Sequence, residues 1–160
     1  MKIEFSPIGI IHTSFKTVDN MPIQPTADNG SEGFIEIFNE YAEGLADLAG
    51  FSHLYLIFHL HECKGHKLKV IPFLDTVERG IFSTRSPARP NPVGLSVVKL
   101  ISIEGNILNI QGLDILDGTP LIDIKPFVPM FEDRKDIRIG WFEGKDGEIP
   151  GKLSDRRFKI

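Results

Sequence analysis

SHLYLIFHLHEC, residues 52–63, decides the fold, because apolar and mixed side chains alternate along it with the period of a β-strand. One face of this segment is entirely apolar and consists of Leu54, Leu56, Phe58 and Leu60. The other face carries histidine, tyrosine and isoleucine side chains. A strand with one apolar and one mixed face is typical of an antiparallel sheet that covers a hydrophobic core on one side.

Further segments with strand character occur on both sides of this stretch. They are residues 8–15, 34–38, 67–73, 93–103, 107–115, 121–128 and 137–142. The Gly105-Asn106 pair between two of them is a typical two-residue hairpin turn. Only residues 39–50 have convincing helical spacing, with Asn39 placed to cap the helix and Gly50 placed to end it. We therefore predict a mainly β protein, an antiparallel β-barrel with one short helix.

Length and charge limit the possible functions. The chain has 160 residues and a formal net charge of −4. This length suits one hydrophobic core, and we predict a barrel domain over residues 1–143 followed by a polar C-terminal tail over residues 144–160. The negative charge argues against a non-specific DNA-binding protein, so any binding of nucleic acid needs a local basic patch.

Cysteine usage and hydropathy indicate the compartment. Cys63 is the only cysteine, so no disulfide framework forms within the chain, and a reducing environment is expected. The first residues alternate in character and carry charge early, unlike the apolar core of a signal peptide. No run approaches the roughly 18 apolar residues of a membrane helix. We expect a cytoplasmic protein that does not bind membranes.

GIFSTRSPARPNPVGLSVVKL, residues 80–100, contains a rigid basic loop before one of the predicted strands. Its three prolines, at positions 87, 90 and 92, fix their own φ and favour extended geometry in the residues before them. We expect Arg85 and Arg89 to be held outward by this loop. Either arginine could also serve only in a surface ion pair, but their density here favours a site for an anionic or planar group.

LDILDGTPLIDIKPFVP, residues 113–129, is the second dense segment. Asp117 precedes glycine, threonine and proline, so it is either a turn aspartate bonded to nearby backbone or a functional carboxylate. Asp123 and Lys125 lie two positions apart on a predicted strand and therefore share a face. Their structural interpretation is an ion pair.

A zinc site is a competing interpretation of the histidine-rich segment. Its candidate ligands are His59, His61, Cys63 and His66. Imidazole and thiolate suit zinc, but the spacing matches no compact zinc signature, and ordinary partly buried histidines on a mixed face are the better explanation. We therefore predict no metal site. The chain also lacks the glycine-rich dinucleotide fingerprint, the phosphate loop and the serine nucleophile elbow.

The two long motifs, together with FSHLYLIFHLHE, closely resemble the TsaA-like family, also called the TrmO or YaeB family. The resemblance covers roughly residues 5–130. It implies a homodimeric β-barrel that uses S-adenosyl-L-methionine to methylate N6 of threonylcarbamoyladenosine at position 37 of tRNA, beside the anticodon. The methyl donor is implied by the resemblance alone.

The resemblance also implies a cofactor site close to the dimer interface. Its residues would be Pro25, Thr26, Ala27, His61, Glu62, Arg85, Leu95, Asp114, Ile115, Leu116 and Asp117. In this family setting, Arg85 is suited to hold the methionine carboxylate with two hydrogen bonds. Acidic groups of the site can offset the sulfonium charge.

Methyl transfer to a weakly nucleophilic nitrogen calls for precise positioning and a proton acceptor. We expect Asp117 or Asp123 to act as the base, with Lys125 nearby, and Arg89, Asn91 and Lys125 to contact RNA. A local basic patch would offset the negative net charge of the chain. Its members would be Arg85, Arg89, Lys99, Lys125, Arg134, Lys135 and Arg138.

Two other functions remain open from the sequence. One is a binding module that holds S-adenosyl-L-methionine without turnover, which would yield no methylated nucleoside. The other is a zinc-dependent hydrolase built on the histidine segment, which would hold stoichiometric metal.

Overall fold

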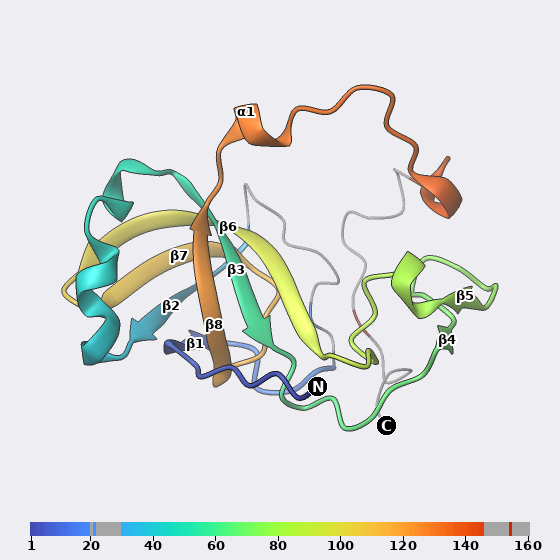
Figure 1. Cartoon of the computed structure of the whole chain (residues 1–160), viewed down its shortest axis with the longest axis horizontal. Helices are drawn as coiled ribbons and strands as arrows, with labels where there is room; N and C mark the ends of the chain where they lie inside the picture. The colour runs from blue at the N-terminus through green and yellow to red at the C-terminus, as the bar shows by residue number, and fades with distance from the viewer. Residues whose placement is uncertain (20, 22–29, 146–153, 155–160) are drawn as a thin grey trace.

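The computed structural model describes residues 1–19, 21, 30–145 and 154. Six strands of this part of the chain close into an antiparallel barrel in the order β1-β2-β7-β6-β3-β8 (Figure 1). They are β1 (Gly9–Thr13), β2 (Ser31–Ile37), β3 (His53–His59), β6 (Val93–Glu104), β7 (Ile107–Leu113) and β8 (Thr119–Pro126). The predicted mainly β fold, an antiparallel barrel with little helix, is confirmed.

The barrel interior is filled by the apolar faces of its strands. The alternation along residues 52–63 is confirmed, because Leu54 and Leu56 are fully buried and Phe58 nearly so. Burial of each such side chain contributes about 1.5–3 kcal/mol. A Cβ at Gly94 would overlap the ring of Phe58, so the close approach of β6 to β3 requires glycine there. The predicted hairpin turn joins β6 to β7, with Gly105 at a φ of +63°.

The predicted helix over residues 39–50 forms as two short 3-10 helices, η1 (Asn39–Leu45) and η2 (Leu48–Gly50). The break lies at Asp47, whose left-handed φ of +64° no continuous helix accepts. Leu45 and Leu48 pack against the barrel core. A single turn of helix that was not predicted, α1 (Pro129–Glu132), begins with a proline, as first turns often do.

Residues 60–92, between β3 and β6, form an insertion beside the barrel (Figure 1). It contains β4 (Lys69–Val70), β5 (Arg79–Gly80) and η3 (Ile81–Ser83) around a small core of Val70, Ile81 and Ala88. The predicted strand over residues 67–73 is reduced to two residues, because Pro72 cannot donate to a ladder and its carbonyl instead begins a turn to Asp75.

The predicted strand over residues 137–142 is wrong. The chain there is irregular and ends in η4 (Gly140–Phe142), with left-handed backbone at Asp136 and Gly140. Figure 1 shows this segment arching from α1 to the insertion. It is fastened by Trp141, whose Nε1 donates to the Ser83 carbonyl over 2.7 Å. Most of residues 144–160 lie outside the described residues, so the division at residue 143 stays a prediction.

Candidate active site

A cavity of about 950 Å³ opens at one end of the barrel, next to the insertion. Its walls come from the segment after β1, the end of β3, the loop before β6 and the turn between β7 and β8. These segments meet because antiparallel neighbours place the end of one strand beside the start of the next. A cavity of this size can hold a cofactor-sized molecule.

The eight predicted cofactor residues that the structure describes all line this cavity. They are His61, Glu62, Arg85, Leu95, Asp114, Ile115, Leu116 and Asp117. The other three, Pro25, Thr26 and Ala27, lie outside the described residues. Both motifs thus face a common space, with Arg85 contributed by the first and Asp114 by the second.

The loop that bears Arg85 is held by its own polar groups. The Thr84 hydroxyl donates to the Ile81 carbonyl over 2.9 Å and accepts from the Ser86 amide over 3.2 Å, and both hydroxyl-bearing residues are buried. Arg85 is exposed and lines the cavity. These bonds and the prolines fix the backbone from which Arg85 projects, so little further entropy is lost when it binds a ligand.

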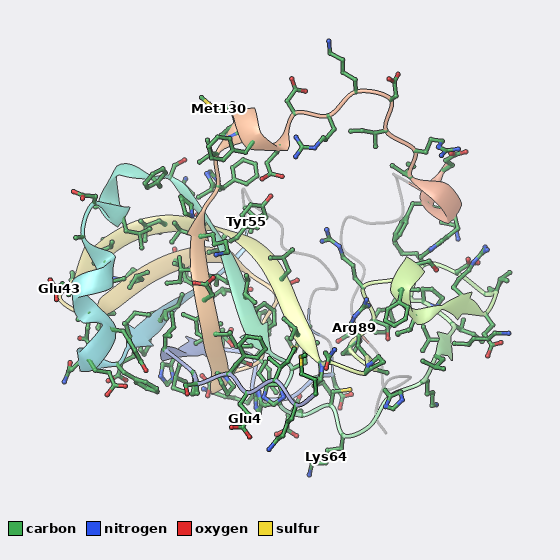
Figure 2. All side chains as sticks on the ribbon, in the orientation of Figure 1. Glu4, Glu43, Tyr55, Lys64, Arg89 and Met130 are labelled. Atoms are coloured by element: carbon green, nitrogen blue, oxygen red, sulfur yellow. The ribbon has the colours of Figure 1, made fainter. Side chains whose placement is uncertain are left out.

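The prediction that Arg89 is held outward is wrong, because its guanidinium bonds backbone carbonyls of its own loop. Its Nη1 donates to the Thr84 carbonyl over 2.7 Å and to the Ile81 carbonyl over 3.2 Å. In Figure 2, Arg89 lies between β6 and the η3 turn. One edge of the guanidinium therefore stabilises the loop, because the turn leaves these carbonyls without strand partners. Its predicted contact with RNA stays a prediction.

Asp114 follows β7 and accepts a 2.7 Å hydrogen bond from the Ser96 hydroxyl of β6. Burial raises the pKa of Asp114 to about 6, although the Ser96 hydrogen bond and the positive charge of Arg85 act in the opposite direction. Ser96 was missed by the sequence reasoning. A lone serine among the apolar residues of a strand was the available signal, because its position faces the barrel interior.

Asp117 lines the cavity and is also a turn aspartate. Its Oδ1 accepts from the Thr13 amide over 3.0 Å, and its Oδ2 lies 2.7 Å from the Lys16 ammonium. The Lys16 bond, followed by the Thr13 amide, holds the pKa of Asp117 below its usual value. Asp117 thus bonds distant backbone rather than that of its own turn, its functional role stays a prediction, and the lowered pKa makes its carboxylate a weak base.

His61 and Glu62 form one wall of the cavity. His61 Nδ1 lies 3.4 Å from the buried Thr119 hydroxyl, and its Nε2 lies 3.7 Å from the Glu62 carboxylate. Within residues 1–19, 21, 30–145 and 154, no three His, Cys, Asp or Glu side chains gather in a way that could hold a metal ion. The arrangement therefore gives no support to the zinc alternative.

Asp123 and Lys125 do not line the cavity. They pair with each other over 2.8 Å on the outer face of β8, where their side chains are 43% and 61% exposed. Asn91 is exposed in the loop before β6. The structure thus separates the predicted base Asp123 from the predicted base Asp117.

No helix of the described residues is long and apolar enough to cross a membrane.

Residues 10–133 match the family model described as the tRNA-methyltransferase O N-terminal domain. A probable S-adenosyl-L-methionine-binding protein of Pyrococcus abyssi is 49% identical over 158 residues, which cover 99% of this chain and 86% of the relative. The human tRNA (adenine(37)-N6)-methyltransferase is 35% identical over 139 residues, which cover 82% of this chain but only 31% of the human protein.

Solved structures agree with these sequence matches. A crystal structure of TrmO superimposes with a TM-score of 0.75 at 38% identity, over 88% of this chain and 64% of that one. TrmO from Pseudomonas aeruginosa gives a TM-score of 0.73 at 35% identity, over 88% of this chain and 63% of that one. The chain therefore spans somewhat less than two thirds of these structures and about a third of the human enzyme.

Proposed function

This chain belongs to the tRNA-methyltransferase O N-terminal domain family, and from that membership we propose that it is an S-adenosyl-L-methionine-dependent methyltransferase that modifies N6 of an adenine in tRNA. The observation that carries the proposal is the cavity that all eight described candidate cofactor residues line. Relatives named as S-adenosyl-L-methionine-binding proteins and as tRNA (adenine(37)-N6)-methyltransferases support it.

The residues of the cavity fit the cofactor. S-adenosyl-L-methionine is a zwitterion with an additional sulfonium charge, and when bound it supplies an electrophilic methyl group. The cavity offers groups of both signs, the exposed Arg85 for the methionine carboxylate and the acids Asp114 and Glu62 for the positive centres. Leu95 and Ile115 add apolar surface to the cavity, which would suit the apolar parts of the cofactor.

The proton acceptor is best assigned to Asp114. The acceptor nitrogen loses a proton when it is methylated, and a base works best when its pKa approaches the working pH. Asp114 lines the cavity with a pKa raised to about 6, whereas the pKa of Asp117 is lowered by Lys16. Asp123 lies on the outer face of the barrel. We therefore place Asp114 ahead of the two residues expected from the sequence, and keep Asp117 as a positioning residue that shapes the turn.

The finer details of the substrate also belong to this proposal. We assign the acceptor as threonylcarbamoyladenosine at position 37 of tRNA, in the anticodon loop, and the site of action as cytoplasmic. We further propose that the chain acts as a homodimer. Leu95 supports this, because it lines the cavity while its side chain remains half exposed at the outer surface of β6, where a second copy would cover it.

A second candidate function is favoured by one observation. The Pyrococcus abyssi relative, 86% of which this chain covers, is named only for binding S-adenosyl-L-methionine. A module that binds the cofactor without turnover would use the same cavity.

Titration calorimetry with S-adenosyl-L-methionine, followed by mass analysis of nucleosides from tRNA incubated with the protein, tests both candidates. Binding together with a methylated adenosine supports the enzyme, and binding without it supports the module. Arg85→Ala should lose cofactor affinity, whereas Asp123→Asn, a carboxylate outside the cavity, is the matched control that should keep it. If Arg85→Ala kept the cofactor affinity of the wild type, the assignment of the cavity as the cofactor site would be contradicted.

A further inference from the structure

Phe82 is the most exposed aromatic side chain of the residues that the structure describes. It lies on η3 with 76% of its surface accessible. The neighbouring Ile81 is fully buried in the small core of the insertion, so the turn separates one apolar side chain that packs from one that faces water. Exposing a large aromatic ring loses the free energy that its burial would contribute.

The backbone that carries Phe82 is fixed on both sides. The Ser83 hydroxyl donates to the Gly80 carbonyl over 2.8 Å, and the Ser83 carbonyl accepts from Trp141 Nε1 over 2.7 Å. The Arg89 hydrogen bond to the Ile81 carbonyl adds a third restraint. An exposed ring on such a supported turn loses little conformational entropy when a flat ligand stacks on it.

The surroundings of Phe82 are basic. The Arg89 guanidinium carbon lies 5.9 Å from the centre of the Phe82 ring, within cation–π range. Trp141, whose Nε1 bonds the Ser83 carbonyl, has Arg79 at 5.7 Å and Lys145 at 5.3 Å from its ring centre, and both of these cations also pair with the Asp75 carboxylate. Residues 60–92 contain six Lys and Arg against three Asp and Glu, a local charge of +3 in a chain of net charge −4. Positive charge interleaved with aromatic rings is the pattern of surfaces that bind single-stranded nucleic acid.

This surface adjoins the candidate active site. Thr84, Arg85 and Arg89 all line the cavity, and η3 directly precedes Thr84 in the chain. An adenine that reaches the cavity must leave the stack of its neighbours, and those neighbours then need new stacking partners.

We propose that Phe82, with Arg89 beside it, is a stacking platform for an unpaired RNA base next to the adenosine that enters the cavity. This inference rests on the proposed function and names the surface that its RNA substrate uses. A second copy in a symmetric interface would bring an equally positive insertion against this one, whereas the anionic RNA backbone complements its charge of +3.

Fluorescence anisotropy with a tRNA anticodon stem-loop that has adenosine at position 37 tests the platform in the full chain. Phe82→Ala should weaken RNA affinity about 5- to 100-fold, the loss expected for one stacked base. Phe82→Leu, which keeps apolar bulk but lacks a flat ring, should lose a similar factor, and Phe82→Trp should retain binding. Phe5→Ala, which removes a ring that is 68% exposed outside the insertion, is the matched control and should bind as the wild type does. Calorimetry with S-adenosyl-L-methionine should give the same affinity for all five proteins.

The outcomes distinguish failure of this inference from failure of the proposed function. Wild-type RNA affinity and methylation in Phe82→Ala would overturn the platform and leave the methyltransferase intact. Full RNA affinity in Phe82→Leu would show that apolar bulk rather than stacking matters and would also overturn it. Loss of self-association by Phe82→Ala without loss of RNA affinity would assign the ring to a second copy. Failure of the wild-type chain to bind or methylate RNA would contradict the proposed function itself, and the platform with it.

Discussion

The barrel and the insertion are stabilised by different interactions. The barrel buries twelve contiguous apolar side chains, eleven on its six strands and Ile115 in the turn after β7, and its hydrogen bonds are the regular ladders between neighbours. The insertion over residues 60–92 has a small core of Val70, Ile81 and Ala88, buries Leu74 as well, and depends further on prolines, hydroxyl bonds and ion pairs. The cavity lies where the two meet. The difference implies that the barrel supplies most of the stability, while the insertion holds a few functional groups in place.

Truncation in the two cores should show the largest contrast. Leu56→Ala removes a fully buried side chain of the barrel and should lower the free energy of unfolding by about 2–5 kcal/mol. Val70→Ala in the insertion core removes less volume. It should lower the free energy of unfolding by less than Leu56→Ala does, because the smaller core of the insertion can relax around the truncated side chain. Urea denaturation of both variants measures this. Equal losses would mean that the insertion is as tightly packed as the barrel.

The buried carboxylate of Asp114 should lower the free energy of unfolding of the protein. Because burial raises its pKa to about 6, the ionised carboxylate disfavours folding above that pH, and the cost vanishes below about pH 4, where both folded and unfolded chains are protonated. Asp114→Asn should therefore raise the free energy of unfolding near pH 8 by up to about 3 kcal/mol and have little effect near pH 4. Activity should be lost. Denaturation at both pH values checks this, and a stability gain that is independent of pH would contradict it.

Asp75 should make the insertion sensitive to acid. Its carboxylate bonds Arg79 Nε over 2.8 Å and lies 3.4 Å from the Lys145 ammonium, and the Arg79 bond, as the largest cause, holds its pKa at about 2. A lowered pKa contributes stability above about pH 4 that is lost as the pH falls toward 2. Trp141 is the only tryptophan of the chain, so its fluorescence reports the docking of this region.

We expect the Trp141 emission of the wild type to shift to longer wavelength as the pH falls from about 4 to about 2. In Asp75→Asn the shifted emission should already be present near pH 7, while the far-ultraviolet signal of the barrel is kept. An Asp75→Asn protein with the wild-type titration would contradict the role of this carboxylate.

The Asp123–Lys125 pair should have the smallest effect. It lies on the outer face of β8 with both side chains well exposed, and such pairs contribute about 0–1 kcal/mol. Asp123→Asn should change neither urea stability beyond that amount nor the affinity for S-adenosyl-L-methionine. A loss of cofactor affinity would bring the outer face of the barrel into the site.

The sequence predicts the barrel well because each strand carries its alternation locally. Leu54, Leu56 and Phe58 are recognisable without knowledge of any partner strand. The failure at residues 137–142 has a physical reason, because Ile137 and Ile139 alternate with polar residues but face solvent on a chain bent by left-handed Asp136 and Gly140. Alternation shows that a segment can be a strand, not that a sheet edge is available for it.

The site was predictable only in part. The two motifs do meet at one cavity, but their polar partners come from distant positions that no local pattern links to them. Ser96 bonds Asp114 across 18 positions, and Thr13 bonds Asp117 across 104. Arg89 donates to the carbonyls of Ile81 and Thr84, which only the folded loop brings within its reach. Burial raises the pKa of Asp114 and Lys16 lowers that of Asp117, and both effects depend on the folded chain, so the sequence could not rank the candidate bases.

The central claim is that the cavity between barrel and insertion binds S-adenosyl-L-methionine and that Asp114 accepts the proton there. The most direct test is nucleoside mass analysis of tRNA after incubation with cofactor that carries a deuterated methyl group, comparing wild type, Asp114→Asn and Asp123→Asn. We predict labelled N6-methyladenosine derivatives with the wild type and Asp123→Asn and none with Asp114→Asn. Label with Asp114→Asn at the wild-type rate, or loss of label with Asp123→Asn alone, would contradict the account.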